Sequence, residues 1–590
     1  MKKILAAILL VVMVFCFASC GQITKTEAPT LNYLYNTSEA HQAIGEYIQS
    51  ALAAAGLNMT LTNQEWNTFL NTRKDGNYTI ARNGWLADYS DPISFLDMWT
   101  SASGNNDVQF GKGAHKDLAM YNIDLTDLGY TLKVTNGTWA QTYDELIKVI
   151  KAETDTAKRY QLMHRAEDMI MDTGCIVPLY YYTDIFMIDD SVDGFFANPL
   201  GYKYFMYTTV EGKNSISVCL SSEPDTIDPA LNSAVDGATM LAHLFQGLAK
   251  WSQKADGTLE IVADAAVSLP EGVLNADGTV TYTYTLRDGL KWSNGDNVTA
   301  ADFEFAWKRA ASNALGADYG YMFEVVKGYG EADVNGLAPL AVTAKDAKTL
   351  EVTLANAVSY WNELLAFPTY YPVHQATVAS EDWATEANTY VCNGPYTISS
   401  WDHDSCITLT KNANYVDANK ITMPEIKCFL SDDANNMLTN FKNGTWQLID
   451  DVPTNEIANL KVQYPTEYKV EGQIGTYYVN FNINADLLPN NTELTGAAKE
   501  KAQQEIRKAI GLLLDRNYIC EEIGQAGQVA APAFVPMGMT DPATGDEFYK
   551  NTGVSEDFDG YYDVSEDAFE ANVAAAVAIL QKYYVLEIAE

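Results

Sequence analysis

The pattern of apolar and polar positions predicts alternating strands and helices near the start of the chain. Apolar residues alternate in LNYLYNT at 31–37 and then recur at helical spacing in EAHQAIGEYIQSALAAAG at 39–56. A strand is predicted for MTLTNQEW at 59–66, a short helix for NTFLNTRKDG at 67–76, and another strand for YTIARNGW at 78–85. This order of elements is typical of an α/β fold.

Later segments add long helices and then hairpins. Residues 142–172 predict two helices with a break, and they lead into the apolar strand CIVPLYYYTDIFMI at 175–188. The sequence then predicts strands joined by Asp-Gly and Asn-Gly turns, as in NADGTVTYTYTLRDGLKWSNGD at 275–296. Further helices are predicted at 299–314 and 500–516.

The last segment, SEDAFEANVAAAVAILQKYYV, is strongly periodic. Ser565 is its expected cap, and Phe569, Val573, Ala576 and Leu580 would form a half-buried face. So apolar a helix needs a neighbour to pack against. Every recognisable segment of the chain occurs once, so no repeat architecture is predicted.

The length and the charge of the chain limit the types of protein that it can be. A chain of 590 residues exceeds the size at which one hydrophobic core stops growing, so two or three compact units are expected. Hydrophobic residues make up 47% and charged residues 19%, as in globular proteins. The 38 Lys and Arg against 77 Asp and Glu give a net charge of −39, which argues against nucleic acid as a partner and mainly favours solubility.

The first twenty residues, MKKILAAILLVVMVFCFASC, predict an export signal, because a basic start precedes an apolar run too short to span a bilayer comfortably. Its end, from Phe17 to Gly21, resembles a bacterial lipobox. The expected lipoprotein has a signal peptide at 1–19, a lipid on Cys20 and a tether at 20–29, which anchor an extracytoplasmic body to the cell membrane. The alternative is an ordinary secretory signal with a chance cysteine.

The cysteines give no sign of a metal site. If Cys16 is removed and Cys20 carries lipid, six remain, with no CxxC or Cys/His ligand spacing, so no metal or other cofactor is expected. Cys392 and Cys406 flank a predicted hairpin and could form a disulfide. The alternative is that both are buried free thiols. The six are Cys175, Cys219, Cys392, Cys406, Cys428 and Cys520.

The most specific stretch is YTLRDGLKWSNGDNVTAADFEFAWKR at 284–309, which predicts a strand, two turns, and a helix capped by Thr299 with Asp302 at its third position. It resembles the signature of the extracytoplasmic oligopeptide-binding receptors of bacterial ABC importers, the family 5 solute-binding proteins. Other phrases follow in that family's order: SEPDTIDPALNS at 222–233, LFQGLAKW at 244–251, NGPYTISSW at 393–401, KNANYVDA at 411–418 and TYYVNFNINA at 476–485.

The order of the remaining phrases departs from that family. Segments that the family places after the last helix stand at 31–186, directly behind the signal. The resemblance therefore implies a circular permutation, in which residues 206–216 join the old ends; a chimera of two truncated genes is the alternative. A permuted chain should bring Glu590 close to the residues near Thr30.

The resemblance implies an α/β, two-lobed, periplasmic-binding-protein-like fold of class II (cluster C) type, with an extra small domain. Two crossing strands would link lobes that close like a hinge over an extended peptide. The parts expected in chain order after the tether are the second lobe at 30–183, return strands of the first lobe at 184–208, a linker at 209–216, the first lobe at 217–245, the extra small domain at 246–385, the first lobe again at 386–474, and the second lobe again at 475–590.

Charged residues are expected at the two ends of the ligand, because enclosing a peptide terminus without an opposite charge costs several kcal/mol. By resemblance Asp88 pairs with the amino terminus, and Arg73 and Arg82 lie near the carboxylate. The alternatives are an aspartate that caps backbone amides and surface arginines with acidic neighbours. Asp91, followed by Pro92, is predicted to cap a helix instead.

Other ligand-binding residues follow from the resemblance alone. They are Gly84, Trp85 and Leu86 for backbone pairing, Trp66 for a side-chain pocket (or the core), a strand at Ser233, Ala234 and Val235 on the opposite wall, and the aromatic residues Tyr321, Tyr181 and Tyr182. Some family members have an acidic residue in place of Ser233 and cysteines in place of Leu86 and Gly475. The first departure puts a preference for basic side chains in doubt.

An enzyme is not expected, because the chain has no HExxH, GxSxG or GxxxxGK[ST] motif. The expected function is capture of short peptides between two closing lobes and their delivery to the permease subunits of an ABC transporter, by a monomer that meets the membrane through Cys20. The alternatives are the same fold with another solute, such as a nickel chelate, a sugar or a signalling peptide, or an inert permuted or chimeric lipoprotein.

Overall fold

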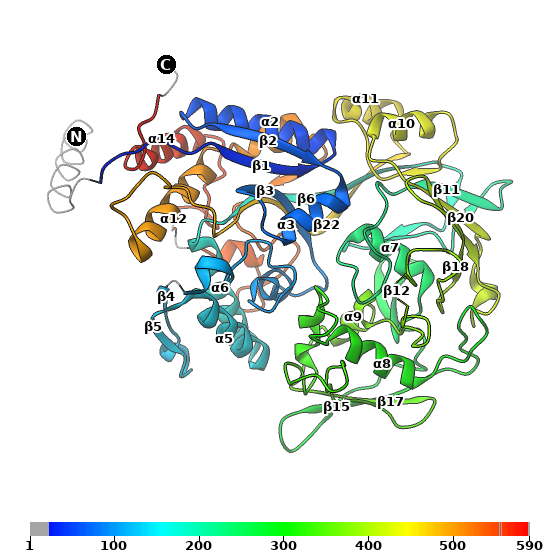
Figure 1. The fold of residues 1–590 in the computed structure, drawn as a ribbon. Coiled ribbons are helices and arrows are strands. Elements are labelled where there is room, and N and C mark those ends of the chain that lie inside the picture. Colours follow the sequence, from blue (N-terminus) through cyan, green and yellow to red (C-terminus); the bar gives the residue numbers. More distant parts are fainter. Residues whose placement is uncertain (1–22, 118, 381, 554, 556, 588–590) are drawn as a thin grey trace.

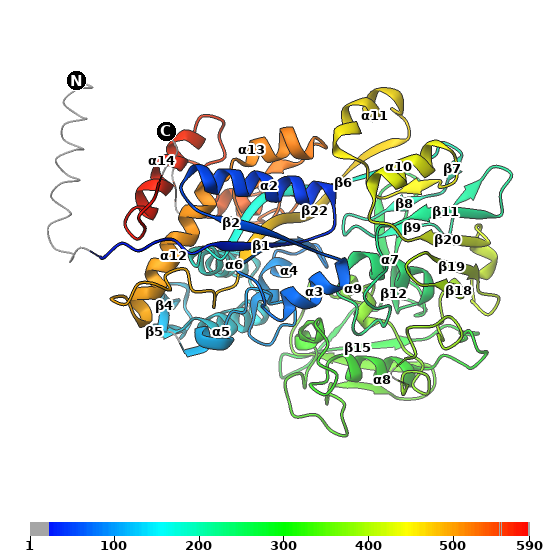
Figure 2. The ribbon, with the colours of Figure 1, turned by 45° about the horizontal axis from the view of Figure 1, so that its top comes forward.

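The computed structural model describes residues 23–587 except 118, 381, 554 and 556. The predicted signal peptide, Cys20 and Glu590 lie outside these residues. The protein has two lobes (Figures 1 and 2). The early part of the chain, drawn in blue and cyan, and its last part, in orange and red, lie together in the second lobe, and the green and yellow middle forms the first lobe with the small domain.

One sheet runs through both lobes. Its ten-strand path is, in spatial order, β18 (Tyr396–Asp402), β19 (Cys406–Lys411), β20 (Glu425–Phe429), β11 (Ser215–Cys219), β21 (Leu448–Ile449), β6 (Ile176–Ile188), β22 (Tyr468–Phe481), β3 (Ile80–Leu86), β1 (Leu31–Asn36) and β2 (Met59–Gln64), and β23 (Val529–Ala530) also pairs with β6. The predicted strands at 31–37, 59–66, 78–85 and 175–188 are confirmed as β1, β2, β3 and β6. The continuity of the sheet across the molecule was not predicted.

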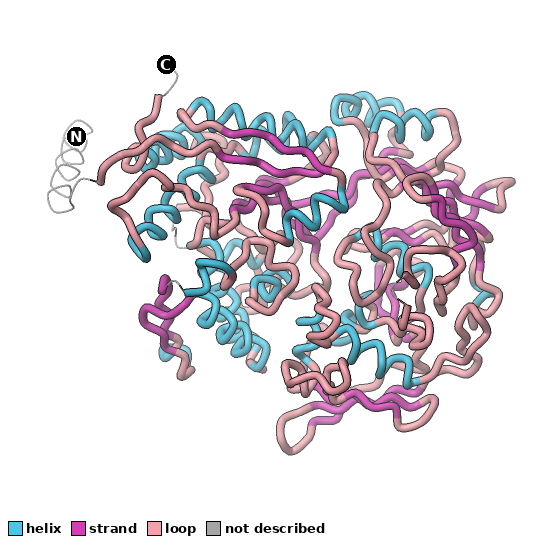
Figure 3. The backbone as a smooth tube through the Cα atoms, viewed as in Figure 1, coloured by secondary structure: helices cyan, strands magenta, loops and turns pink. Residues whose placement is uncertain are grey.

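Strands β6 and β22 connect the lobes, as expected. They pair antiparallel from Tyr468 opposite Met187 to Asn480 opposite Ile176, and they cross the middle of the molecule (Figure 3). Their register shifts between Gly472 and Thr476, which places a bulge halfway along the pair. A bulge disrupts the ladder locally and strengthens the twist, so the strand pair bends most easily at this point.

In the second lobe, β1 lies parallel to both β2 and β3. Its helices are α2 (Glu39–Ala54), α3 (Trp66–Lys74), α4 (Ile93–Leu96), α5 (Trp139–Ala152), α6 (Thr156–Asp172), α12 (Gly496–Leu512), α13 (Arg516–Tyr518) and α14 (Phe569–Leu580), with a hairpin of β4 (Ala119–Asp124) and β5 (Lys133–Thr138). The side chain of Ser38 caps α2 by accepting from the amide of His41, and Ile44, Ile48 and Leu52 are buried.

The terminal helix differs from its prediction. It packs on α12 and buries Ala576 and Leu580, which supplies the neighbour that its apolar face requires. It begins only at Phe569, because the hydroxyl of Ser565 donates to Asp563 instead of capping the helix. The expected cap at Ser565 was therefore wrong.

In the first lobe, β11 lies parallel to β20 and β21. Its other elements are α7 (Val235–Leu244), α10 (Ala434–Lys442), α11 (Ile457–Gln463) and the short strands β7 (Val192–Asp193), β8 (Phe196–Ala197), β9 (Lys203–Tyr204) and β10 (Thr209–Val210). The small domain holds the hairpin of β12 (Ala249–Gln253) and β13 (Leu259–Ala263), a sheet of β14 (Val273–Leu274), β15 (Val280–Thr285), β17 (Thr349–Leu354) and β16 (Val342–Ala344), and helices α8 (Ala300–Ala310) and α9 (Trp361–Leu364). The capping box of Thr299 and Asp302 at α8 is confirmed.

The two described ends of the chain meet. Thr26 forms a parallel bridge with Tyr584. The Thr26 amide donates to the Tyr583 carbonyl at 3.0 Å, and the Thr26 carbonyl accepts from the Val585 amide at 2.9 Å. The six cysteines of the described chain are free thiols, so the disulfide between Cys392 and Cys406 is absent. Within residues 23–587, apart from the four gaps, no helix has the length and apolarity to cross a membrane.

Candidate functional site

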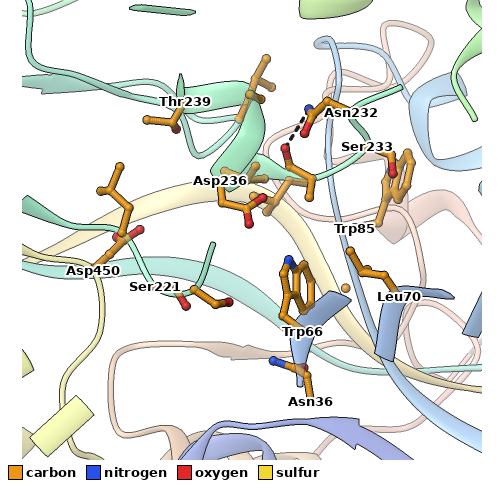
Figure 4. Close-up of a pocket in the computed structure, with 18 of the residues that line it drawn as sticks. Asn36, Trp66, Leu70, Trp85, Ser221, Asn232, Ser233, Asp236, Thr239 and Asp450 are labelled. Carbon is orange, nitrogen blue, oxygen red and sulfur yellow. Dashed lines mark hydrogen bonds between the residues drawn. The ribbon is translucent and has the colours of Figure 1, made fainter. Parts of the chain in front are cut away.

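A cavity of about 400 Å³ lies between the lobes, within the usual range of about 300–1,000 Å³ for ligand pockets. Parallel strands of both lobes point their carboxyl ends at it. From the second lobe come Asn36 at the end of β1, Trp66 just after β2 and Asp88 just after β3; from the first lobe come Ser221 after β11 and Asp450 after β21. Figure 4 shows Asn36, Trp66, Ser221 and Asp450. The carboxyl ends of parallel strands are where α/β proteins bind ligands.

Strand β3 offers the cavity an unpaired edge. On one side it pairs with β22 along all seven residues, but on the other side β1 pairs only with Ile80 and Ala81. The backbone from Gly84 to Leu86 therefore has no strand partner along one edge, although the Gly84 amide donates to the side chain of Asn83 at 2.8 Å. A side chain on Gly84 would place its Cβ 2.1 Å from the hydroxyl of Tyr182, so any larger residue here would have to displace Tyr182. An extended ligand can pair with such an edge through its main chain.

Asp88 is a buried carboxylate at one end of this edge, with only 5% of its surface exposed. It accepts hydrogen bonds from the Tyr319 hydroxyl at 2.9 Å and the Ser94 hydroxyl at 3.5 Å. It forms no ion pair with any residue that the structure describes. Burial raises its pKa well above the usual range, against the smaller opposing effect of the Tyr319 hydrogen bond. A cationic group would remove this penalty.

Arg82 is the complementary buried cation. Its Nε donates to Asn36 at 2.7 Å and its Nη2 to His41 Nε2 at 2.8 Å. Burial, and then the charge of Arg82, lower the pKa of His41 well below its usual value, so His41 is neutral and its Nε2 accepts. No carboxylate among the described residues pairs with Arg82, and its Nη1 makes no hydrogen bond with them. The guanidinium is thus available to an anion.

Arg73, the second expected arginine, lines the cavity but differs in its charge balance. Its Nε lies 2.7 Å from Asp107 Oδ2, and both side chains are almost fully buried. The charge of Arg73 is therefore compensated within the protein. Both arginines line the cavity as expected, and Arg82 is the one whose charge is not compensated by a carboxylate of the described chain.

The lobes are closed over the cavity. Lys74 of α3 pairs with Asp318 of the small domain and donates to Ser233 at 3.0 Å. Further along the rim, the amide of Ser90 donates to Glu363 at 2.8 Å, and the rings of Tyr89 and Tyr360 stack with centroids 4.2 Å apart. These contacts join the second lobe to the small domain, so the small domain forms part of the closing wall.

The model of bacterial extracellular solute-binding proteins, family 5 (middle region), matches residues 19–107 and 260–582, which is more than half of the chain. The chain belongs to this family. Proteins of this family bind a solute and do not transform it, so the chain is not an enzyme. Among relatives, the oligopeptide-binding protein OppA of Bacillus subtilis is 34% identical over 338 residues, and the dipeptide-binding protein DppE of the same species is 29% identical over 335 residues.

These alignments span little more than half of the relatives: 58% of OppA and 57% of DppE, against 56% of this chain in both cases. A solved structure of an oligopeptide ABC transporter substrate-binding domain from Bacillus anthracis is 26% identical, with a TM-score of 0.50 over 63% of this chain and 67% of that one. The two-lobed fold of this family 5 solute-binding protein agrees with that likeness.

The structure brings most of the expected site residues of this solute-binding protein to the cavity. Those that line it are Asp88, Arg82, Arg73, Gly84, Trp85, Leu86, Trp66, Ser233, Ala234, Val235 and Tyr182. Asp91 lies outside: it accepts from the Ile93 amide and pairs with Arg159 at 2.7 Å, which confirms its predicted role at the start of a helix. Ser233 and Ala234 form no strand, because α7 begins at Val235, and that expectation was wrong.

Tyr181 and Tyr321 do not line the cavity. Side chains alternate along β6, so Tyr182 faces the ligand space while the Tyr181 hydroxyl donates to Ala533 on the far side. Tyr321 is buried in the turn of helix at 320–325, and residues two apart in a helix point in different directions. Tyr319, two residues earlier, provides the hydroxyl that reaches Asp88.

Sequence reasoning missed several polar residues of the cavity: Asn36, His41, Lys74, Asp107, Asp236, Tyr319, Asp432, Asp450 and Asp451. The position of Asn36 at the carboxyl end of the predicted strand at 31–37 was a usable signal, whereas Asp432, Asp450 and Asp451 follow β20 and β21, which were not predicted. Asp236 on α7 faces Trp66 and Ser221 (Figure 4), and burial raises its pKa to about 6. In the described part of the chain, no group of three His, Cys, Asp or Glu side chains is placed to hold a metal ion.

Proposed function

We propose that this solute-binding protein captures short peptides in an extended conformation between its lobes and delivers them to the permease subunits of an ABC transporter. The observation that carries the proposal is the pair of uncompensated charges, Asp88 and Arg82, at either end of the free edge of β3. A zwitterionic peptide matches all three features, with its ammonium group at Asp88, its main chain on the edge from Gly84 to Leu86, and its carboxylate at Arg82. The peptide-binding names of the relatives support this choice of solute.

The other expected ligand contacts belong to the same proposal. Trp66 and Trp85 line the walls, and Ser233, Ala234 and Val235 face them from the first lobe. The side chains of the peptide would fill the space between these walls. Because the main-chain pairing does not depend on side-chain type, such a site accepts many sequences.

Anchoring and assembly are proposed from the sequence. A lipid on Cys20 would hold the protein, as a monomer, at the outer face of the cell membrane, near the permease. The described chain starts close to this point, and Thr24 is fixed to the second lobe by donating from its amide to Glu493 at 3.1 Å. The tether would therefore leave the body from the lobe that carries Asp88.

Mass spectrometry of ligand released from the purified protein tests the proposed solute. We expect a mixture of short peptides, because closure over an uncompensated Asp88 and Arg82 favours retention of a zwitterion. The control is protein that has been denatured, washed free of ligand and refolded. This protein should release no peptide unless it is first incubated with a tripeptide. A nickel chelate, a sugar or another non-peptide solute in the cavity would contradict the proposal.

We also propose that the chain is circularly permuted, with 30–183 and 475–590 forming the second lobe, 184–208, 217–245 and 386–474 the first lobe, and 246–385 the small domain. The meeting of Thr26 with Tyr584 supports this order, because permutation requires adjacent ends. So does the linker at 209–216, where residues 211–214 form an exposed turn. A colinear alignment with an unpermuted relative can follow only one of the exchanged segments, in keeping with the partial coverage.

A re-permuted chain tests this order. The variant opens the chain within 211–214 and joins Leu586 to Thr30 through a short Gly-Ser linker. We expect it to fold, with a melting temperature within a few degrees of the parent and the same peptide affinity, because every packed element keeps its neighbours. A matched variant opened inside β22 should not fold. Failure of the first variant to fold would count against the permutation.

A further inference from the structure

Carboxylates gather at one end of the cavity, where the two lobes face each other. Asp432 follows β20, Asp450 and Asp451 follow β21, and all three line the cavity. Glu39, in the first turn of α2, approaches from the second lobe: its Oε1 accepts from Asn435 at 2.6 Å, and its charge acts on Asp451. Carboxylates from both lobes therefore converge on this end of the ligand space.

The protein supplies too few cations to balance them. Lys203, 2% exposed, lies 2.6 Å from Asp450 and 3.0 Å from Asp184, so two carboxylates share one ammonium group. Asp432 and Asp451 form no ion pair with any residue of the described chain. Burial first, and then the charges of Asp450 and Glu39, raise the pKa of Asp451 to about 7. Negative charge thus accumulates here without a partner.

Arg82 lines the same cavity, which is an independent sign of a ligand. Arg82 is 8% exposed, and its guanidinium donates to Asn36 and His41, which stand on either side of Glu39 in the chain. Nη1 of Arg82 is the one guanidinium nitrogen without a partner among the described residues, so it can donate to an anionic group of a ligand. A ligand in this cavity therefore meets both a free guanidinium and unpaired carboxylates.

We propose that this end of the cavity is a subsite for a basic carboxyl-terminal residue, whose carboxylate binds Arg82 and whose lysine or arginine side chain reaches Asp451 and its neighbours Asp450 and Asp432. This proposal rests on the proposed peptide function and adds a side-chain preference to it. One residue with both charges satisfies both observations, whereas an apolar terminal residue leaves the carboxylates unpaired. It also places the preference for basic side chains on the first-lobe strand ends rather than at Ser233.

The test compares three tripeptides that differ only in the last residue: Ala-Ala-Lys, Ala-Ala-norleucine and Ala-Ala-Glu. Norleucine has the chain length of lysine without the ammonium group. Isothermal titration calorimetry at physiological salt should give at least tenfold tighter binding for the lysine peptide than for the norleucine peptide, and the weakest binding for the glutamate peptide.

Two variants assign the effect to the subsite. Asp451→Asn should reduce the advantage of the lysine peptide over the norleucine peptide severalfold; the new side chain can still accept from the Val452 amide, as Asp451 does at 2.7 Å. Asp432→Asn, on the neighbouring strand end, should act in the same direction and serves if the first variant folds poorly. Asp256→Asn in an exposed hairpin turn is the matched control and should change none of the affinities.

The outcomes separate the subsite from the function. Equal affinities for the lysine and norleucine peptides would overturn the basic subsite and leave the peptide receptor intact. A lysine advantage that survives in both aspartate variants would overturn the assignment to these carboxylates. If none of the three peptides binds while another solute does, the proposed function itself fails.

Discussion

Replacing Asp88 with asparagine is expected to weaken binding of a tripeptide with a free amino terminus by about a hundredfold or more. The carboxylate is buried, has no cationic partner among the described residues, and accepts from Tyr319 and Ser94. Removing one member of a buried ion pair costs about 3–5 kcal/mol, because the other charge stays enclosed. Calorimetric titration of the parent and the variant with Ala-Ala-Ala measures the loss.

The control for this prediction is the amino-acetylated peptide, which has no ammonium group. It should bind both proteins equally weakly, and acetylated peptide that binds the parent as well as the free one would remove Asp88 from ligand recognition. The affinity for a peptide with a free amino terminus should also depend on pH. Burial raises the pKa of Asp88 in the empty cavity, and a bound ammonium group lowers this pKa again. The affinity is therefore full above the raised pKa and is lost as the pH falls through that value. In the Asp88→Asn variant, this loss of peptide affinity at low pH should be absent.

Replacing Arg82 with glutamine should weaken binding of the free-acid tripeptide by about thirty- to a hundredfold, since the variant retains hydrogen-bond donors but no charge to pair with the carboxylate. Arg82→Lys keeps the charge but loses the planar fork, so an intermediate affinity is expected. The carboxyl-terminal amide of the same peptide has no charge to lose and should bind the parent and both variants within a few-fold. Surface plasmon resonance with both peptides gives the comparison.

Arg73→Gln is the matched variant at the same cavity. Because Arg73 is paired with Asp107, its removal should lower the melting temperature and leave the preference for acid over amide in place. Equal loss of this preference in both arginine variants would show that the carboxylate lies between them, contrary to the assignment of Arg82 alone.

Much of the site was accessible from sequence because it lies on local motifs. Gly84, Trp85, Leu86 and Asp88 occupy one strand and the turn after it, so a phrase of a few residues fixes their relative positions. The same holds for the helix start at Asp91 and the capping box at Thr299. Such features depend on neighbours in the chain, and a recognised pattern is sufficient to place them.

The residues that were missed depend on contacts between distant segments. The pairing of Arg73 with Asp107 crosses from a helix to a loop, and no spacing rule predicts it. Tyr321 was chosen, but Tyr319 is the residue that lines the cavity and donates to Asp88, because a two-residue shift at the start of a helical turn changes the direction of the side chain. The carboxylates after β20 and β21 gained meaning only when the second lobe was placed opposite them.

The pair of β6 and β22 is also a constraint on unfolding. Each strand contributes hydrogen bonds to both lobes, and β21 and β3 lie directly on its two sides. If one lobe loses its structure, the exposed half of the strand pair weakens the edge on which the other lobe is built. The two lobes therefore share one cooperative unit, and a destabilising substitution in either lobe lowers the stability of the whole receptor.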